Sequence, residues 1–335
     1  MNAIETHSLS RRYGRTEAVH DLTLTIPTGS IFALLGPNGA GKTTTIKVLM
    51  NLLAPTSGEA RILGTDSRRL RESDRARIGY VSENQQLPLW MTVRQLLDYC
   101  RPFYPTWDRD LEKKLLNKFS LPPDRKLKHL SRGMLMKASL LSSLAYRPKL
   151  LVLDEPFSGL DPLVRDEFIH GVLETSAAGE WTVLISSHDI AEIEQLADHV
   201  AILDAGRLKL SEPTESLQAR FRRIELTLHS VPESANVPVG LPPPGAPASG
   251  RLPSSASPTR DLSISAASHE FPQTWLAFER TGTLARFIET RFDPAATESA
   301  CRTHFPDAQV TAHPMTLREI FVVLARASRP AATAA

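Results

Sequence analysis

Cysteine, aromatic side chains and an excess of charge are all scarce in this sequence. Its 335 residues include two cysteines, Cys100 and Cys301, and 6% aromatic residues. Two cysteines in unrelated contexts supply neither a disulfide framework nor the spacing of a structural metal site, and they fit a reducing compartment. The formal net charge is only +2, which gives no electrostatic support for a nucleic-acid-binding protein. We therefore expect no nucleic-acid partner.

Long apolar runs are lacking as well. IFALLG at Ile31 and LLVL at Leu150 are among the longest runs, whereas a membrane-spanning helix needs about 20 apolar residues. The N-terminal segment MNAIETHSLSRRYG has no apolar stretch of the kind that a signal peptide contains. We expect a soluble cytoplasmic chain, for which any function at a membrane requires a partner that spans it.

Strand and helix patterns alternate along the first part of the chain. Residues 1–30 alternate apolar and polar side chains, which is the period of half-exposed strands. The continuous apolar runs IFALL at Ile31, LLVLD at Leu150 and TVLISS at Thr182 predict buried strands. A helical pattern over residues 43–53 follows the first of these strands. Buried strands alternating with helices predict an α/β fold with a mainly parallel sheet.

The composition changes near residue 230. Residues 231–259 are dominated by Pro, Ser, Ala and Gly, so they predict an extended or disordered loop. Strand patterns lie on both sides of this loop. MTLREIFVVLAR at Met315 predicts a closing amphipathic helix with Thr316 as its N-cap. The loop is therefore interpreted as an insertion within a small C-terminal α/β domain.

A phosphate-binding loop follows the first buried strand. GPNGAGKT fits the pattern GxxxxGK[ST] between a predicted strand and a predicted helix. Glycines in such a loop let backbone N–H groups converge on phosphate oxygens, and the helix start adds its positive dipole end. Lys42 would reach the β and γ phosphates, and the hydroxyl of Thr43 would bind Mg²⁺. The residues predicted to bind ATP in this loop are Gly36, Pro37, Asn38, Gly39, Ala40, Gly41, Lys42, Thr43 and Thr44.

Two adjacent acids end the second buried strand, in LLVLDEP. An acid at such a position is costly unless it serves a cation or a hydrogen-bond network. Asp154 is expected to hold Mg²⁺ or its water. Glu155 points the other way and can polarise an attacking water molecule.

The run SRGMLMKASLLSSLAYRPKLLVLDEPFSGLD, from Ser131 to Asp161, resembles the ATP-binding subunits of ABC transporters. The resemblance covers residues 1 to about 220, with every motif in order, and the variations within these motifs resemble those of the ABC-2 type exporter subfamily. It implies an α/β P-loop NTPase fold of the ABC type, with an antiparallel β subdomain and a helical subdomain at about 85–147. We expect this ATP-binding domain at 1–220 and a C-terminal accessory α/β domain at 221–335.

The resemblance also implies roles for residues outside the phosphate loop. Ser131 and Gly133 occupy the signature motif, which contacts ATP held by a second ATP-binding subunit of a homo- or heterodimer. Asp161 ends the D-loop, and Tyr13 would stack on adenine. His188, in ISSH, corresponds to the switch histidine, so the catalytic residues implied are Lys42, Glu155 and His188.

Two departures from the family pattern involve charge. IGYVSE places Glu83 where the family usually has glutamine, and a carboxylate there can still coordinate Mg²⁺. In the signature, Arg132 and Met134 stand where glycine and glutamine are commoner.

The family function is ATP hydrolysis that powers a separate membrane permease, with the ATPase peripheral on the inner face of the membrane. We expect Leu87, Trp90 and Met91 to line the groove that holds a coupling helix of the permease. The alternative is a soluble ABC ATPase without a permease, of the cluster-assembly type. A kinase or small GTPase is disfavoured because no guanine-reading NKxD motif is present and the signature region would be unexplained.

Overall fold

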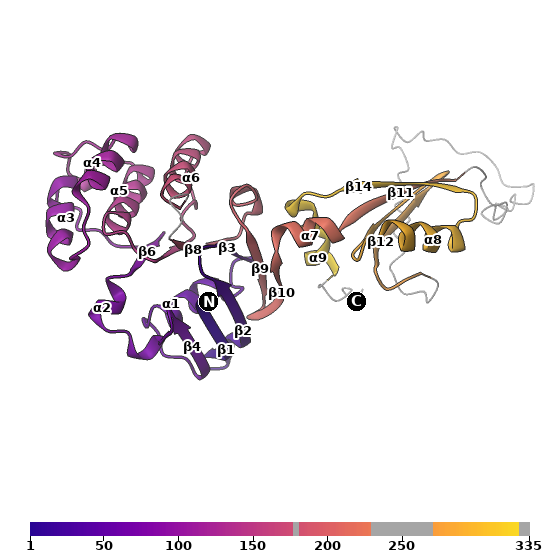
Figure 1. Ribbon diagram of the computed structural model, residues 1–335, viewed down its shortest axis with the longest axis horizontal. Coiled ribbons are helices and arrows are strands. Elements are labelled where there is room, and N and C mark those ends of the chain that lie inside the picture. The colour runs from indigo at the N-terminus through magenta and orange to yellow at the C-terminus, as the bar shows by residue number, and fades with distance from the viewer. Residues whose placement is uncertain (177–180, 229–270, 328–335) are drawn as a thin grey trace, which may run out of the picture. The chain divides into compact units, whose positions relative to one another are not determined.

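The computed structural model describes residues 1–176, 181–228 and 271–327. The chain forms two compact units, Met1–Glu215 and Ser216–Ala335 (Figure 1). Within the residues described, no helix combines the length and apolar character needed to cross a bilayer.

A six-stranded sheet forms the centre of the first unit. Its strand order is β10-β9-β3-β8-β7-β6, and all pairs are parallel except the edge pair β9–β10. Every residue of β3, β7 and β8 is buried, which confirms the strands expected from the continuous apolar runs. The strands are β3 Ile31–Leu35, β6 Ile78–Ser82, β7 Leu150–Asp154, β8 Thr182–Ser187, β9 His199–Asp204 and β10 Arg207–Pro213.

The order of these strands decides where a site can form. Because β3, β8 and β7 are parallel neighbours, the segments that follow them lie at the same edge of the sheet. Those segments are the phosphate loop, the residues after Ser187 and the residues after Asp154.

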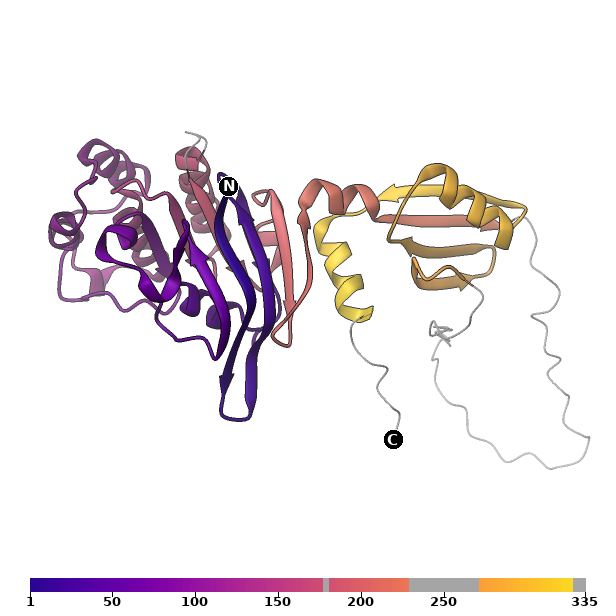
Figure 2. The ribbon, with the colours of Figure 1, turned by 60° about the horizontal axis from the view of Figure 1, so that its bottom comes forward.

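A second sheet in the same unit is antiparallel, with order β2-β1-β4-β5. Its long β1–β2 hairpin is prominent in Figure 2, and it confirms the strands expected over residues 1–30. The strands are β1 Asn2–Tyr13, β2 Thr16–Pro27, β4 Ser57–Ile62 and β5 Thr65–Asp66.

Helix α1, Lys42–Leu49, contacts β2 and β4 of the antiparallel sheet and β7 of the parallel one. Its buried apolar residues join the core shared by both sheets. The expected helix over 43–53 was wrong at its end. Asn51 adopts a left-handed φ of 55°, and the N–H groups of Leu52 and Leu53 turn back to the carbonyl of Lys47. The chain therefore leaves the helix one turn earlier than the pattern suggested.

Three helices, α3, α4 and α5, form a group beyond the β6 edge of the parallel sheet (Figure 1). α5 contacts β6 and also α3, α4 and α6. The helices of the first unit are α1, α2 Glu72–Arg75, α3 Val93–Cys100, α4 Arg109–Lys118, α5 Arg132–Leu144 and α6 Pro162–Ser176. Short 3-10 helices are η1 Ser67–Arg69, η2 Arg101–Phe103, η3 Leu127–His129 and η4 Ile190–Glu192.

The second unit is a four-stranded antiparallel sheet with a helix on one face (Figure 2). Trp275 and Phe287 of the sheet pack with Cys301 of α8 in its core. Thr316 caps α9, as expected: it accepts a hydrogen bond from the N–H of Glu319 and donates its own N–H to that carboxylate. The expected loop at 231–259 lies outside the described residues. The elements are α7 Thr214–Arg220, which leads into this unit, β11 Arg222–Leu228, β12 Trp275–Thr281, β13 Leu284–Glu289, α8 Pro294–His304, β14 Ala308–Pro314 and α9 Leu317–Ala327.

Candidate active site

The phosphate loop connects β3 to α1 and is shaped by its glycines. Gly41 has a φ of 102°, and a Cβ atom added to it would lie 2.3 Å from the carbonyl oxygen of Ala18. Only glycine fits this backbone and this close approach. Helix α1 begins at the next residue, and Gly41 provides no side-chain cap for it. The N–H groups of the first turn therefore stay available to an anion, as a phosphate site requires.

Lys42 is the most deeply placed cation of the site, with 4% of its side chain exposed. Its ammonium lies 2.7 Å from the carbonyl oxygen of Gly36, 3.2 Å from that of Pro37 and 3.0 Å from Oε1 of Glu155. An ammonium has three donors, and here each one has an acceptor. A buried charge is tolerated only when it is paired in this way.

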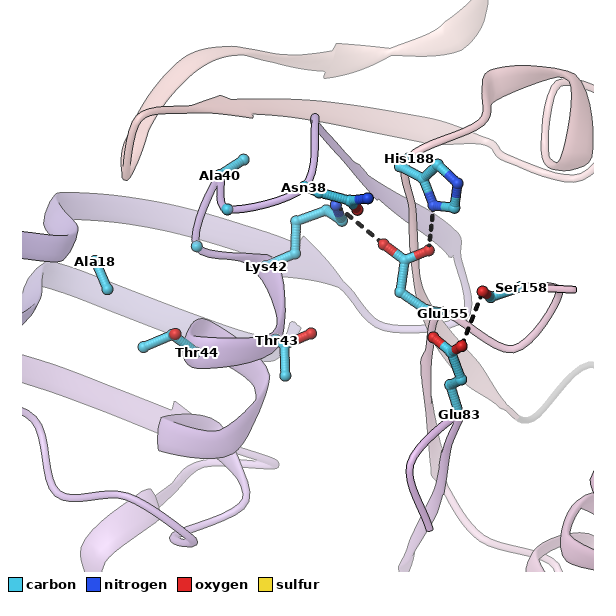
Figure 3. A pocket seen from close by; sticks show the side chains of 12 residues that line it. Ala18, Asn38, Ala40, Lys42, Thr43, Thr44, Glu83, Glu155, Ser158 and His188 are labelled. Atoms are coloured by element: carbon cyan, nitrogen blue, oxygen red, sulfur yellow. Dashed lines mark hydrogen bonds and ion pairs between the residues drawn. The ribbon is translucent and has the colours of Figure 1, made fainter.

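Glu155 lies between two catalytic candidates. While Oε1 pairs with Lys42, Oε2 lies 2.7 Å from Nδ1 of His188 (Figure 3). The backbone of Glu155 has a φ of 52°, which is uncommon for a residue with a side chain. Its N–H donates to Oγ of Ser186 at 3.0 Å. Strained backbone held by its surroundings is characteristic of functional positions, and here it aims the carboxylate at the phosphate loop.

Asp154 ends β7 with 2% of its surface exposed. Its Oδ1 accepts hydrogen bonds from the hydroxyls of Thr43, at 3.0 Å, and Ser186, at 2.8 Å. Burial raises the pKa of this carboxyl, and the two hydroxyls oppose the rise without cancelling it. Thr43 and Asp154 together form an oxygen-only set, which is the chemistry that suits Mg²⁺.

The raised pKa makes a prediction about stability. A carboxyl whose pKa is higher in the folded than in the unfolded state stabilises the fold at a pH below its unfolded-state pKa. This contribution is lost as the pH rises through its folded-state pKa. At pH 7 the ionised Asp154 therefore destabilises the protein. We expect Asp154→Asn to raise the apparent Tm without nucleotide by roughly 2–4 °C, because the amide oxygen can still accept both hydroxyl hydrogen bonds. Differential scanning calorimetry measures this. The same variant should lose the stabilisation that Mg²⁺ with ATP gives the wild type, and a lower Tm would contradict the interpretation.

These residues meet at a pocket of about 520 Å³, a size typical of small-ligand sites. Nine residues of the phosphate loop were expected at the ATP site, and seven of them line this pocket, together with Glu83, Glu155 and His188. Gly36, Pro37 and Asp154 are not among the lining residues. Figure 3 shows the side chains around the pocket. The lining residues are Ala18, Asn38, Gly39, Ala40, Gly41, Lys42, Thr43, Thr44, Glu83, Glu155, Ser158 and His188.

Other predicted residues lie outside this lining. Ser131 is the N-cap of α5, where its Oγ accepts from the N–H of Met134 at 3.2 Å. Gly133 is buried, and a Cβ atom there would lie 2.7 Å from Val164 of α6. Asp161 caps the start of α6 through the N–H of Val164. Both helix starts thus need these residues for their own geometry.

Tyr13 also lies outside the lining, at the end of β1. Its side chain is 44% exposed. The Arg11 guanidinium lies 4.7 Å from the ring centroid, within cation–π range.

The sequence interpretation gave no role in the site to three residues that the structure places there. Ala18 and Ser158 line the pocket, and Ser186 holds both Asp154 and the backbone of Glu155. Ser186 could have been identified by its place at the end of a buried strand, beside the strand that ends in the two acids. No local sequence feature identifies Ala18, which belongs to β2 and lines the pocket from that strand.

A second, smaller hollow lies beside the pocket. Of the residues expected to line the permease groove, Leu87 lines this hollow and Trp90 does not; Leu89 lines it as well. Met91 is 8% exposed and does not line the hollow. The N–H of Leu127 donates to its carbonyl. The hollow is lined by Ser82, Glu83, Gln85, Leu87, Leu89, Arg132, Leu135, Met136 and Ser139.

Known proteins resemble this chain in both sequence and structure. The ABC transporter family model matches residues 19–158. The daunorubicin/doxorubicin resistance ATP-binding protein DrrA of Streptomyces peucetius is 36% identical over 240 residues, covering 70% of this chain and 72% of that protein. The bacitracin transport ATP-binding protein BcrA of Bacillus licheniformis is 33% identical over 222 residues, covering 66% and 72%.

Among solved structures, an ATP-binding subunit of an ABC transporter matches with a TM-score of 0.59 and 30% identity, covering 65% of this chain and 92% of that one. The expected fold class is thereby confirmed. The chain belongs to the ABC transporter family, as one of its ATP-binding and ATP-hydrolysing subunits.

Proposed function

We propose that this chain powers a separate membrane permease of the exporter type. The names of its relatives support this, since they refer to drug resistance, to bacitracin transport and, for a 36% identical protein of Rhizobium leguminosarum, to Nod factor export. The observation that carries the proposal is the Glu155 carboxylate, held between the buried Lys42 ammonium and the His188 ring beside the phosphate loop. We assign the ATPase to residues 1–220 and an accessory domain to 221–335.

Hydrolysis uses this arrangement directly. A water oxygen bonds to the γ-phosphorus of ATP while the bond to the β–γ bridging oxygen breaks, and Glu155 orients the water and accepts its proton. Lys42 exchanges its protein acceptors for phosphate oxygens and stabilises their charge. As an imidazolium, His188 can donate to Glu155 through Nδ1 and to the γ-phosphate from its other ring nitrogen.

Mg²⁺ is assigned to the oxygen set of Thr43 and Asp154, with Glu83 as a further carboxylate at the pocket. When bound, this ion neutralises charge on the phosphates. Asp154 would then gain a cation that favours its ionised form.

A second ATP-binding subunit would complete the site. The start of α5, with Ser131 and Gly133, offers unpaired N–H groups of a helix N-terminus to the phosphates of ATP held by the other subunit. Asp161 caps the start of α6 beside it. Tyr13 remains the candidate for stacking on adenine, on the ring face that Arg11 does not cover.

We assign the permease contact to the hollow around Leu87 and Leu89, and this contact would place the chain on the inner face of the membrane. Leu89 is 48% exposed. Its exposure beside Leu87 gives an apolar surface next to the ATP pocket, where closure of the site can be transmitted to a partner.

Membrane recruitment tests the proposal. When the chain is co-expressed with the multi-span protein encoded next to its gene, we expect it in the membrane fraction, and expressed alone it should stay in the supernatant. Leu89→Arg should reduce recruitment by about tenfold, since a buried unpaired charge costs about that much or more in binding. Leu52→Arg is the matched control, because Leu52 is 55% exposed and lies outside the hollow. Recruitment that is absent, or equally sensitive to both changes, would contradict the assignment.

A further inference from the structure

Three carboxylates lie at the ATP pocket. Asp154 ends β7 and Glu155 comes directly after it, while Glu83 follows the neighbouring strand β6. Glu83 and Glu155 both line the pocket. ATP is itself an anion, so each carboxylate that faces it without a cation opposes binding. Glu83 therefore opposes ATP binding unless a cation, whether Mg²⁺ or a basic side chain, lies beside it.

Arg132 provides that partner from the first turn of α5. Its guanidinium forms an ion pair and hydrogen bond with Oε1 of Glu83. The hydroxyl of Ser158 donates to the same oxygen at 2.9 Å, as Figure 3 shows for Ser158. The pair therefore joins the end of β6, the start of α5 and the turn before α6.

Gly159 makes room for this pair. Its φ is 67°, and a Cβ atom there would lie 2.8 Å from Nη1 of Arg132. The guanidinium thus packs against a backbone turn that has no side chain in its way. Arginine suits this position because it brings a full charge together with a charge-assisted hydrogen bond to the carboxylate.

We propose that Arg132 is a positioning residue that neutralises Glu83 and holds it against the Ser158 turn, so that the pocket accepts ATP despite a third carboxylate. The proposal rests on the proposed function, because it concerns the same ATP site. The two charged residues that depart from the family pattern, Glu83 and Arg132, then compensate each other. Their contact joins positions 49 residues apart in the chain.

The effect of the pair should appear in ATP binding rather than in folding. Half of the Arg132 side chain is exposed, and so is about a quarter of Glu83. Exposed ion pairs contribute little to folding stability because solvent screens them. Removing Arg132, however, leaves a carboxylate unpaired beside an anionic ligand.

A double-mutant cycle tests this with the full chain. The four proteins are the wild type, Arg132→Ala, Glu83→Gln and the double variant, and Kd for ATP with Mg²⁺ is measured for each by isothermal titration calorimetry. Arg132→Ala alone should weaken binding by about tenfold. In the Glu83→Gln background the same change should weaken binding by less than about twofold, because no charge is then left unpaired. The defect of Arg132→Ala should also shrink as salt is raised.

Further variants and measurements keep the result interpretable. Arg132→Lys retains the charge and should recover most of the affinity. All variants should keep the Tm of the wild type within a few degrees. Equal losses from Arg132→Ala in both backgrounds would overturn the proposal, because Arg132 would then act on ATP directly and not through Glu83.

Failure of this proposal is distinguishable from failure of the proposed function. If the wild type hydrolyses ATP and is recruited by the permease while the cycle is additive, only the role of Arg132 is wrong. If the wild type does not hydrolyse ATP, the proposed function fails whatever the cycle shows.

Discussion

Glu155→Gln should bind ATP with Mg²⁺ as tightly as the wild type and hydrolyse it at least about 100-fold more slowly. The amide has the same shape as the carboxylate, so its oxygen can still accept from Lys42 at the position where Oε1 lies 3.0 Å away. It cannot accept a proton from water. Phosphate release under single-turnover conditions measures the loss, and titration of a fluorescent ATP analogue measures the binding.

Because binding persists without turnover, the Glu155→Gln protein should also accumulate as an ATP-bound dimer, which size-exclusion chromatography with ATP can detect. Glu72→Gln is the matched control: Glu72 is exposed on α2, and this change should leave both rate and dimer content at wild-type values. Normal turnover by Glu155→Gln would remove Glu155 from its proposed role.

The position of Glu155 was predictable because it depends on regular structure. Parallel strands place their carboxyl ends at one edge, and three buried apolar runs ending in Gly36, Asp154 and Ser187 mark those ends in the sequence. The left-handed φ of Glu155 was not predictable in the same way, because it depends on the Ser186 hydroxyl that holds its N–H.

Contacts between separate segments were the hardest to predict. Glu83 and Arg132 belonged to two separate departures from the family pattern, since no periodicity relates the end of β6 to the start of α5. Which side chains line the hollow was hard to predict for a related reason. Residues 87–91 precede α3 in a loop, so no period decides that Leu89 faces outward while Met91 faces inward.

Gly41→Ala should abolish most ATP binding, weakening Kd by at least about 100-fold. Its φ of 102° is strained for any residue with a Cβ atom, and that atom would lie 2.3 Å from the carbonyl oxygen of Ala18. Strain of this kind costs about 1–3 kcal/mol, and the contact is with backbone of β2 rather than with a side chain that can turn away. The phosphate loop would have to shift, and with it the first N–H groups of α1 and the Lys42 ammonium.

Gly39→Ala tests the effect of backbone strain in the phosphate loop without a steric contact to β2. Gly39 has a similar φ of 83°, yet a Cβ atom there would meet nothing within 4 Å. We therefore expect Gly39→Ala to weaken binding by about tenfold at most, because it carries only the backbone strain. Gly64→Ala, with a φ of 83° and open space outside the loop, should lower Tm and leave Kd unchanged. Equal losses of affinity from Gly41→Ala and Gly39→Ala would show that the approach of β2 does not shape the phosphate loop, since then only the left-handed backbone would matter.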